Sequence, residues 1–324
     1  MEVFMSRLLV VCVPELLPEQ TARIRSVAEQ AGFSVRFLDA VPEDGAELRE
    51  AEVILGSDPA LSRQAPRLRW LCTSFAGVNQ FMSPDAFANP DALLTNSSGA
   101  YGVTIAEHLI MVTLMALRRQ IEYNRIVANR QWIRRLPMRS IHGSRVLLLG
   151  TGDIGQEAAK RLRAFEPAEI IGVNRGGRNP HQLFDRVFPV DQLDQLLPDA
   201  DLVMISLPGT PETHHLLGPR QLKLLPDHAL LVNVGRGPVI DGQALEAELR
   251  AGRLMAALDV FEEEPLPPDH SLWSCPRLII TPHVAGDTSL PYTLERIVTL
   301  FLEDFQRYVA GLPLLRLVDR TRGY

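Results

Sequence analysis

Three polar side chains in the second half of the chain are of the types needed to reduce a carbonyl group. His283 can donate a proton near neutral pH, and a carboxylate such as Glu264 beside it would favour the protonated ring and fix its orientation. A guanidinium such as that of Arg236 can hold a substrate carboxylate in a bidentate fork and polarise the carbonyl next to it. The residues lie in Asn233-Val-Gly-Arg236-Gly237, Asp259-Val-Phe-Glu-Glu-Glu264-Pro265 and Thr281-Pro282-His283. Together they are typical of a site that reduces a 2-oxo acid.

Each of these residues follows an apolar run that predicts a strand, at 230–234, 255–260 and 278–281. Taken singly, each has a structural alternative: Arg236 could cap a loop, Glu264 could belong to a solvated acidic run, and His283 could be structural. The carboxyl ends of parallel strands meet at one edge of a sheet, so we expect all three to share one cleft with a bound coenzyme.

A glycine pattern earlier in the chain predicts the coenzyme. The apolar run 146–149 is followed by Gly150, Gly152 and Gly155 in the spacing G-x-G-x-x-G, and then by a helical pattern. These glycines permit a tight turn, close approach to a pyrophosphate, and close packing of helix on strand, while the helix start offers N–H groups to the phosphates. We include Asp153 and Ile154, which lie between the glycines, in the expected contact. The alternative is a glycine-rich turn that binds nothing.

The end of the next strand, 169–173, indicates which dinucleotide is preferred. An NAD-binding unit has an acid about 20 residues after the glycines, where it bonds the ribose 2′-hydroxyl. Here Asn174, Arg175 and Arg178 occupy this region, so no acid repels a 2′-phosphate and two guanidinium groups could bind one. We therefore favour NADP(H), with NAD(H) as the alternative cofactor and two solvated cations as the structural alternative.

Further coenzyme contacts are expected at other strand ends. Asp259 could accept a hydrogen bond from the nicotinamide carboxamide. The remaining expected contacts are Leu207, Pro208 and Thr213 around the adenosine, and Val234, Gly235, Ala285 and Gly286 beside Arg236 and His283.

The turn Ser74-Phe-Ala-Gly77-Val78-Asn79 follows a predicted strand at 70–73. A glycine at such a position exposes backbone N–H groups, which suit a carboxylate, and the alternative is a plain turn.

Composition bounds the class of protein. The chain has 324 residues, is 46% hydrophobic and carries a net charge of −6 without blocks of like charge. These values predict about two domains and argue against nucleic acid or a membrane as partner. The apolar runs 8–13 and 103–117 are a first strand and a buried helix in this interpretation, because neither fits a signal peptide or a membrane span. Cys12, Cys72 and Cys275 are scattered, which fits buried thiols at the first two positions, a cytoplasmic protein and no metal site.

Strands alternate with helices along most of the chain, which predicts parallel sheets covered on both faces. Expected strands in the first part are 8–13, 33–38, 53–55, 70–73 and 93–95, with a helix at 18–31. In the second part, 202–207 adds a strand to those above and 241–250 is a helix with Asp241 as its N-cap. A long amphipathic helix is expected from Asp287 to about Ala310.

Four of these segments resemble the D-isomer-specific 2-hydroxyacid dehydrogenases: Gly150-Thr-Gly-Asp-Ile-Gly155, Asn233-Val-Gly-Arg236-Gly237, Ala257-Leu-Asp259-Val-Phe-Glu-Glu-Glu264-Pro265 and Pro282-His283-Val-Ala-Gly286. The resemblance implies an Arg236, Glu264 and His283 catalytic set and a homodimer. It also implies two doubly wound α/β domains with a cleft between them. These are a flavodoxin-like substrate domain (1–99 plus 287–324) and a Rossmann cofactor domain (100–286). Ala76, Gly77 and Val78 would bind the substrate carboxylate through their backbone.

Sequence differences between the branches of that family narrow the expected substrate and coenzyme. The Arg175 and Arg178 region resembles the glyoxylate and hydroxypyruvate reductase branch, and Ser57-Asp58-Pro59 lacks the arginine typical of phosphoglycerate dehydrogenases. Formate dehydrogenases of the family have Gln where Glu264 stands, and Tyr101 is unusual for the group. The leading hypothesis is an NADP(H)-dependent reductase of glyoxylate, hydroxypyruvate or a similar small 2-oxo acid. The alternatives are an NAD(H)-dependent D-2-hydroxyacid dehydrogenase with another substrate and a nucleotide-sensing protein like the corepressors that share this fold.

Overall fold

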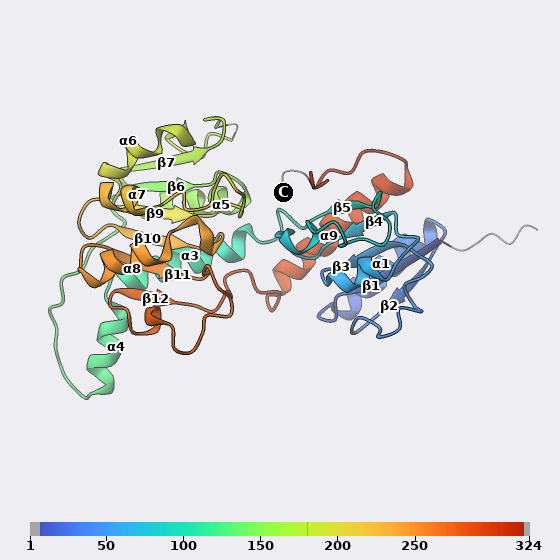
Figure 1. The fold of residues 1–324 in the computed structure, drawn as a ribbon, viewed down its shortest axis with the longest axis horizontal. Coiled ribbons are helices and arrows are strands. Elements are labelled where there is room, and N and C mark those ends of the chain that lie inside the picture. The colour runs from blue at the N-terminus through green and yellow to red at the C-terminus, as the bar shows by residue number, and fades with distance from the viewer. Residues whose placement is uncertain (1–6, 180, 321–324) are drawn as a thin grey trace, which may run out of the picture. The chain divides into compact units, whose positions relative to one another are not determined.

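The chain forms two compact units in the computed structural model, which describes residues 7–179 and 181–320 (Figure 1). The first unit contains residues up to Tyr101 together with those from Asp287 onward, and the second contains Gly102–Gly286. Each unit has its own parallel sheet, as the expected fold class requires, and that fold class is confirmed. Among the described residues, no helix is both long and apolar enough to cross a bilayer.

The first unit is built on a five-stranded parallel sheet with the order β2-β1-β3-β4-β5. Its strands are β1 (Arg7–Cys12), β2 (Phe33–Phe37), β3 (Ala51–Gly56), β4 (Trp70–Cys72) and β5 (Leu93–Thr95). Helices α1 (Pro18–Gln30), α2 (Pro59–Arg63) and α9 (Pro291–Val309) belong to the same unit. This is the strand order of flavodoxin-like folds.

Alternation along the strands gives this sheet two apolar faces. One face packs Val10, Ile54 and Leu71 with Leu61 of α2. On the other, Trp70 stacks on Phe301 of α9, with ring centroids 5.5 Å apart. A helix from the end of the sequence therefore completes the core of a sheet formed by its beginning.

The second unit has a seven-stranded parallel sheet with the order β12-β11-β10-β9-β6-β7-β8. The strands are β6 (Arg145–Leu149), β7 (Glu169–Asn174), β8 (Arg186–Pro189), β9 (Leu202–Ile205), β10 (Leu230–Asn233), β11 (Met255–Leu258) and β12 (Leu278–Ile280). The helices are α3 (Gly102–Leu117), α4 (Gln120–Ala128), α5 (Asp153–Arg163), α6 (Leu193–Leu196), α7 (Pro219–Leu224) and α8 (Gly242–Arg250). Residues of α6, α7 and α8 pack on one face of the sheet, and α3 contacts α5, β10 and β11.

The observed elements confirm some of the expectations and correct others. The last helix begins at Pro291 rather than Asp287, because Leu290 is extended and the proline takes the first helical position. Asp241 caps α8 as expected, accepting a hydrogen bond from the Ala244 N–H. The short edge strand β8 and the helix α4 carry no strong pattern and were not predicted. Cys72 is buried as expected, but Cys12 is partly exposed, which corrects the expectation for that thiol.

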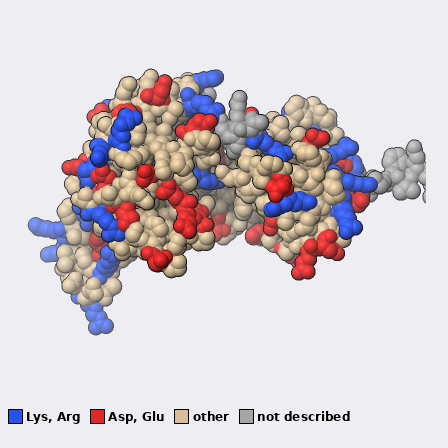
Figure 2. All heavy atoms as spheres, viewed as in Figure 1, with Lys and Arg blue, Asp and Glu red and all other residues tan. Residues whose placement is uncertain are grey.

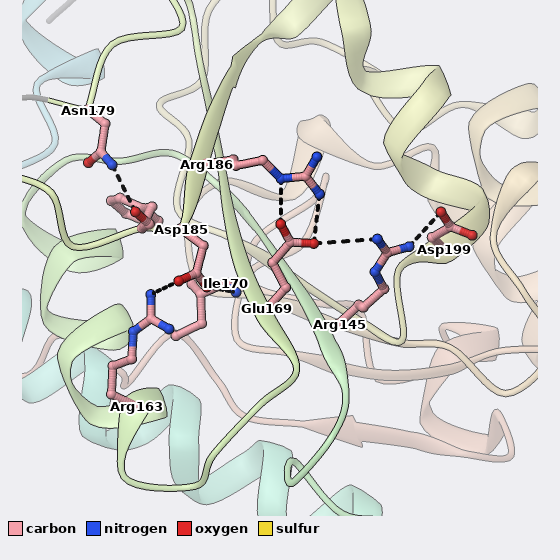
Figure 3. Close-up of polar contacts among 9 residues, drawn as sticks. Arg145, Arg163, Glu169, Ile170, Asn179, Asp185, Arg186 and Asp199 are labelled. Carbon is pink, nitrogen blue, oxygen red and sulfur yellow. Dashed lines mark hydrogen bonds and ion pairs between the residues drawn. The ribbon is translucent and has the colours of Figure 1, made fainter.

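Ion pairs join the amino-terminal ends of β6, β7 and β8 (Figure 3). Glu169 on β7 accepts hydrogen bonds from Arg186 on β8, with a 2.7 Å contact to Nη2, and its Oε2 lies 3.5 Å from Nη2 of Arg145 on β6. The hydrogen bonds from Arg186 lower the pKa of the Glu169 carboxyl, and the charges of Arg186 and Arg145 lower it further. Asp185 accepts hydrogen bonds from Arg163 and from the Ile170 N–H. These contacts lie at the end of the sheet opposite the glycine turn.

Candidate active site

The three residues proposed for chemistry follow three neighbouring strands of the seven-stranded sheet. Arg236 comes after β10, Glu264 after β11 and His283 after β12, and these strands are adjacent in the sheet order. Their carboxyl ends lie at one edge because all three strands are parallel. The fold of the second unit thus brings together side chains that are up to 47 residues apart in the sequence.

Glu264 orients the ring of His283. Its Oε2 lies 2.6 Å from Nδ1 of the histidine, and its Oε1 accepts a hydrogen bond of 2.8 Å from the Phe261 N–H. Each carboxylate oxygen therefore has a partner, which fixes the carboxyl plane. The imidazole is half exposed, and its Nε2 has no partner among the described residues. Nε2 is the ring atom that can exchange a proton with a ligand.

Asp259 anchors the loop that carries His283. The carboxylate is 2% exposed; its Oδ1 accepts from the Thr281 hydroxyl at 2.5 Å and the Val284 N–H at 3.0 Å, and its Oδ2 accepts from the Ala285 N–H at 2.9 Å. His283 has a φ of 55°, in the left-handed region, and its N–H donates to the Asp259 carbonyl. The internal partners of Asp259 hold this loop in place, and the carboxamide contact expected from the sequence stays a prediction.

His108 of α3 contacts Thr281, the residue whose hydroxyl binds Asp259. Its Nε2 lies 3.2 Å from the Thr281 hydroxyl oxygen, and that hydroxyl already gives its only proton to Asp259. His108 therefore donates from Nε2. Burial lowers the pKa of His108, and the charge of Asp259 opposes this shift.

Arg236 is held by the loop around it. The buried Asn233 donates from Nδ2 to the Arg236 carbonyl at 2.9 Å and accepts from the Gly235 N–H at 3.0 Å. Burial lowers the pKa of Arg236, and the negative charge of Glu264 opposes that shift. The guanidinium still keeps its charge in a folded protein.

Gly237 brings the loop of Arg236 against the loop of Glu264. A Cβ at this position would lie 1.9 Å from the carbonyl carbon of Phe261, whose N–H binds Glu264. Only a glycine allows the two backbones to approach so closely.

The glycine turn fits a pyrophosphate. Gly150 has a φ of 105°, which favours glycine, and a Cβ on Gly155 would lie 2.1 Å from the Gly150 carbonyl oxygen. Gly152 is the N-cap of α5, with no side-chain cap, and a Cβ there would meet no atom within 4 Å. Asp153 and Ile154 begin α5, so their backbone N–H groups point out of the start of the helix.

The strand order places this turn where a dinucleotide binds. The chain runs from β6 to β7 and β8 on one side and returns to β9 on the other side of β6. Ligands of open α/β sheets occupy the crevice at such a reversal. Leu207 and Pro208 follow β9 there, and the Thr213 hydroxyl donates to the Pro208 carbonyl at 2.7 Å, which closes the loop.

Other expected coenzyme contacts flank these loops. The Val234 N–H donates to the Ile205 carbonyl at 3.1 Å, and a Cβ on Gly235 would lie 2.7 Å from the Leu207 carbonyl oxygen. Ala285 is buried and bound to Asp259, and Gly286 is the last residue of the second unit.

Asn174 organises the loop after β7. Its Nδ2 donates to the Thr151 hydroxyl at 2.7 Å and to the Arg178 carbonyl at 2.9 Å, and its Oδ1 accepts from the Gly176 N–H at 3.1 Å. The amide thus ties the loop to the glycine turn, a role that the sequence alone did not indicate. Arg175 and Arg178 are both exposed, and Arg178 forms no ion pair with a described residue.

Ala76, Gly77 and Val78 lie in the first unit, in the turn after β4. Within the part of the chain that the structure describes, their backbone N–H groups donate to no protein acceptor. Ala76 and Gly77 are partly exposed. The turn therefore has the donors that a carboxylate needs.

Sequence reasoning missed four supporting residues: Asn233, Gly237, Thr281 and His108. The first three stand within or beside the quoted motifs, so their position was a usable signal. His108 stands beside Glu107 in a mostly apolar helix, and this was the only indication of a polar partner.

Comparisons with known proteins identify the family of the chain. The family described as "D-isomer specific 2-hydroxyacid dehydrogenase, NAD binding domain" matches residues 110–285. Glyoxylate/hydroxypyruvate reductase B of Yersinia enterocolitica is 33% identical over 261 residues, which cover 77% of this chain and 79% of the relative.

Two solved structures have the same fold over almost the whole chain. A D-isomer specific 2-hydroxyacid dehydrogenase family protein from Aeromonas salmonicida superposes with a TM-score of 0.85 at 32% identity, covering 97% of this chain and 99% of the other. The NADPH-dependent glyoxylate/hydroxypyruvate reductase of Sinorhizobium meliloti, in complex with NADP and sulfate, gives a TM-score of 0.81 at 26% identity, with coverages of 98% and 100%.

Proposed function

Because the chain belongs to the D-isomer-specific 2-hydroxyacid dehydrogenase family, we propose that it uses NADPH to reduce a small 2-oxo acid such as glyoxylate or hydroxypyruvate. The product is the 2-hydroxy acid, as the D-isomer where it is chiral. The observation that supports this most directly is the 2.6 Å contact between Glu264 and His283 at the strand end next to that of Arg236. His283, Glu264 and Arg236 all lie at the carboxyl-terminal ends of the strands, and the glycine turn lies at the same end of this sheet.

The residues divide the work of reduction. Bound coenzyme supplies the hydride that adds to the carbonyl carbon. His283 donates a proton from Nε2 to the carbonyl oxygen. Before this transfer, the carboxylate of Glu264 stabilises the imidazolium through its contact with Nδ1. Arg236 binds the substrate carboxylate and polarises the adjacent carbonyl. Ala76, Gly77 and Val78 add backbone N–H donors to the carboxylate.

The preference for NADPH rests on the loop after β7. Its described residues carry two exposed guanidinium groups, and Asn174 stands where an acid would repel the 2′-phosphate. The Sinorhizobium relative is described as NADPH-dependent, which supports the same preference here. The three free thiols suit a cytoplasmic enzyme.

A small substrate is favoured by the end of β3. Ser57-Asp58-Pro59 offers no cation there for a phosphate group, and the Ser57 hydroxyl is bound to Thr73 and Ser74 at 2.7 Å and 2.6 Å. Glyoxylate and hydroxypyruvate carry no second anion, so they need none.

Steady-state kinetics tests the proposal. Purified protein is assayed with glyoxylate, hydroxypyruvate, pyruvate and 2-oxoglutarate, each with NADPH and NADH. We expect turnover of the two small acids first named, with a higher kcat/KM for NADPH. Absence of coenzyme oxidation with every acid would contradict the function, and a clear preference for NADH would overturn only the coenzyme assignment.

We also propose a homodimer formed through the arm of residues 118–139. The arm contains seven arginines and one acid, a net charge of +6, so the rest of a chain with a total of −6 carries −12. Lys and Arg gather over the end of the second unit that α4 occupies (Figure 2). Trp132 and Val127 of this arm are 89% and 69% exposed. A basic arm with exposed apolar side chains fits a second, acidic copy.

Sedimentation velocity decides the assembly. The wild-type protein should sediment as a dimer, and Trp132→Glu should shift it toward a monomer. A wild-type monomer at micromolar concentration would contradict the proposal.

A further inference from the structure

The turn after β4 is held from one side by a single stretch of chain. Four consecutive carbonyl groups each accept a hydrogen bond from a residue between 96 and 101. The pairs are Ser97 Oγ to Thr73 O at 2.9 Å, Tyr101 Oη to Ser74 O at 2.7 Å, Ser97 N to Phe75 O at 3.0 Å, and Asn96 Nδ2 to Ala76 O at 2.9 Å.

These four hydrogen bonds from residues 96–101, called the brace below, determine where the N–H groups of the turn point. A trans peptide directs its N–H opposite to its carbonyl, so fixing the carbonyl of one residue fixes the N–H of the next. The bonds to Phe75 and Ala76 therefore turn the N–H groups of Ala76 and Gly77 away from the brace. These N–H groups are among those that donate to no described protein acceptor.

Tyr101 fixes the first peptide of the turn. Its ring is 4% exposed, and burial raises the pKa of the phenol, so the hydroxyl stays protonated and can donate. The bond to the Ser74 carbonyl sets the Phe75 N–H, which donates to the Thr73 hydroxyl at 3.2 Å. Ser74 is itself buried, so loss of the phenol hydroxyl would leave its carbonyl without a partner and favour a shift of the turn.

We propose that Tyr101 is a positioning residue for the 2-oxo acid: it helps to hold residues 73–77 so that the N–H groups of Ala76 and Gly77 point at the substrate carboxylate. The inference rests on the proposed function and adds a specific side chain to it. Tyr101 does not touch the substrate; it acts through the Ser74 carbonyl. Coenzyme binding depends on the glycine turn of the other unit, so Tyr101 affects the oxo acid alone.

The variant Tyr101→Phe removes the hydroxyl and keeps the ring. We expect the KM for the 2-oxo acid to rise about 5- to 20-fold, the range that loss of one hydrogen bond gives, with kcat within about threefold and the KM for NADPH unchanged. Tyr308→Phe is the matched control, because the Tyr308 phenol donates to Glu52 at 2.8 Å in the same unit without contacting the turn. It should leave all three constants unchanged.

A second variant, at another hydrogen bond of the same turn, tests the inference if Tyr101→Phe does not fold. Ser97→Ala removes the hydroxyl that binds the Thr73 carbonyl and should also raise the KM for the oxo acid at an unchanged KM for NADPH. An unchanged KM for the oxo acid in Tyr101→Phe, or equal increases in both KM values, would overturn the inference.

Hydrogen–deuterium exchange separates this inference from the proposed function. The amides of Phe75 and Ser97, which are hydrogen-bonded to Thr73 and Phe75, should exchange faster in Tyr101→Phe than in the wild type or in Tyr308→Phe, whether or not the protein reduces any oxo acid. If the wild type is inactive, the proposed function fails, and equal exchange in the three proteins would then overturn the inference as well.

Discussion

Glu264 meets His283 through one contact of 2.6 Å between Oε2 and Nδ1, although the two residues follow different strands. The variant Glu264→Gln keeps the shape of the side chain and can still pair with the ring, but it removes the charge that stabilises an imidazolium. We expect kcat for the oxo acid to fall about 10- to 100-fold, with the KM for NADPH unchanged. Stopped-flow or steady-state assays measure this.

The control for that variant is Glu263→Gln, at the exposed neighbouring position. It should keep wild-type kcat. Equal kcat values in Glu264→Gln and Glu263→Gln would mean that the negative charge beside His283 has no part in the reaction.

Gly237→Ala should damage both stability and activity. The new Cβ would lie 1.9 Å from the Phe261 carbonyl carbon, so either the Arg236 loop or the Glu264 loop must move. Overpacking of this kind costs about 1–3 kcal/mol, which lowers Tm by roughly 2–12 °C for a unit of this size. Gly218→Ala is the control, because its Cβ would come no closer than 3.4 Å to another residue. Thermal unfolding that gives equal Tm values for both variants would contradict the prediction.

Arg178→Ser should separate the two coenzymes. We choose Arg178 because it forms no ion pair among the described residues. Arg175 lies near Glu212: hydrogen bonds to its own N–H and to Thr210 lower the pKa of that carboxyl most, and the charge of Arg175 lowers it further. Loss of a charged hydrogen bond to the 2′-phosphate should raise the KM for NADPH about 10- to 100-fold and leave the KM for NADH unchanged. Arg220→Ser, which removes a guanidinium paired with Asp194, should change neither. Parallel increases for both coenzymes would refute a 2′-phosphate contact.

Glu169→Gln should lower stability in a way that depends on pH. The hydrogen bonds from Arg186, with the neighbouring charges, hold the pKa of Glu169 below its ordinary value of 4.5. A carboxyl whose pKa is lower in the folded state stabilises the fold above the unfolded pKa and stops doing so as the pH falls through the folded pKa. We expect Tm to drop by about 2–4 °C at pH 7 and the difference from wild type to close below pH 4.5.

Scanning calorimetry from pH 3 to 8 checks this, with Glu166→Gln as the control. Glu166 is exposed, and its only described ion pair is a 3.6 Å contact with His142. A Tm difference for Glu169→Gln that persists unchanged at low pH would show that packing, not charge, is responsible.

The parts of this molecule that follow from local physics could be predicted from the sequence. Gly150, Gly152 and Gly155 mark the turn because only glycine permits the φ of the first and the close contact of the third. Arg236, Glu264 and His283 could be assigned to one edge because strand ends of a parallel sheet meet there. That assignment needs only the strand ends, not the side-chain positions.

The parts that depend on tertiary contact could not be predicted. Tyr101 and Ser74 are 27 residues apart, and no pattern in either segment indicates that a phenol meets that carbonyl. The coenzyme contact expected of Asn174 stays a prediction, whereas the bonds of its amide to Thr151, Arg178 and Gly176 appear only in the folded turn. The start of α9 was instead a local signal that was missed, because a proline such as Pro291 disfavours helical backbone at the residue before it, here Leu290.

The stacking of Trp70 on Phe301 has a consequence during synthesis of the protein. As the chain leaves the ribosome, the strands of the first unit emerge early, but the helix that covers Trp70 is translated only after the entire second unit. The Rossmann-type unit can fold as soon as residue 286 is free, whereas the early sheet must wait with one apolar face uncovered. A ribosome stalled before residue 291 would therefore hold one folded unit and one unfinished one.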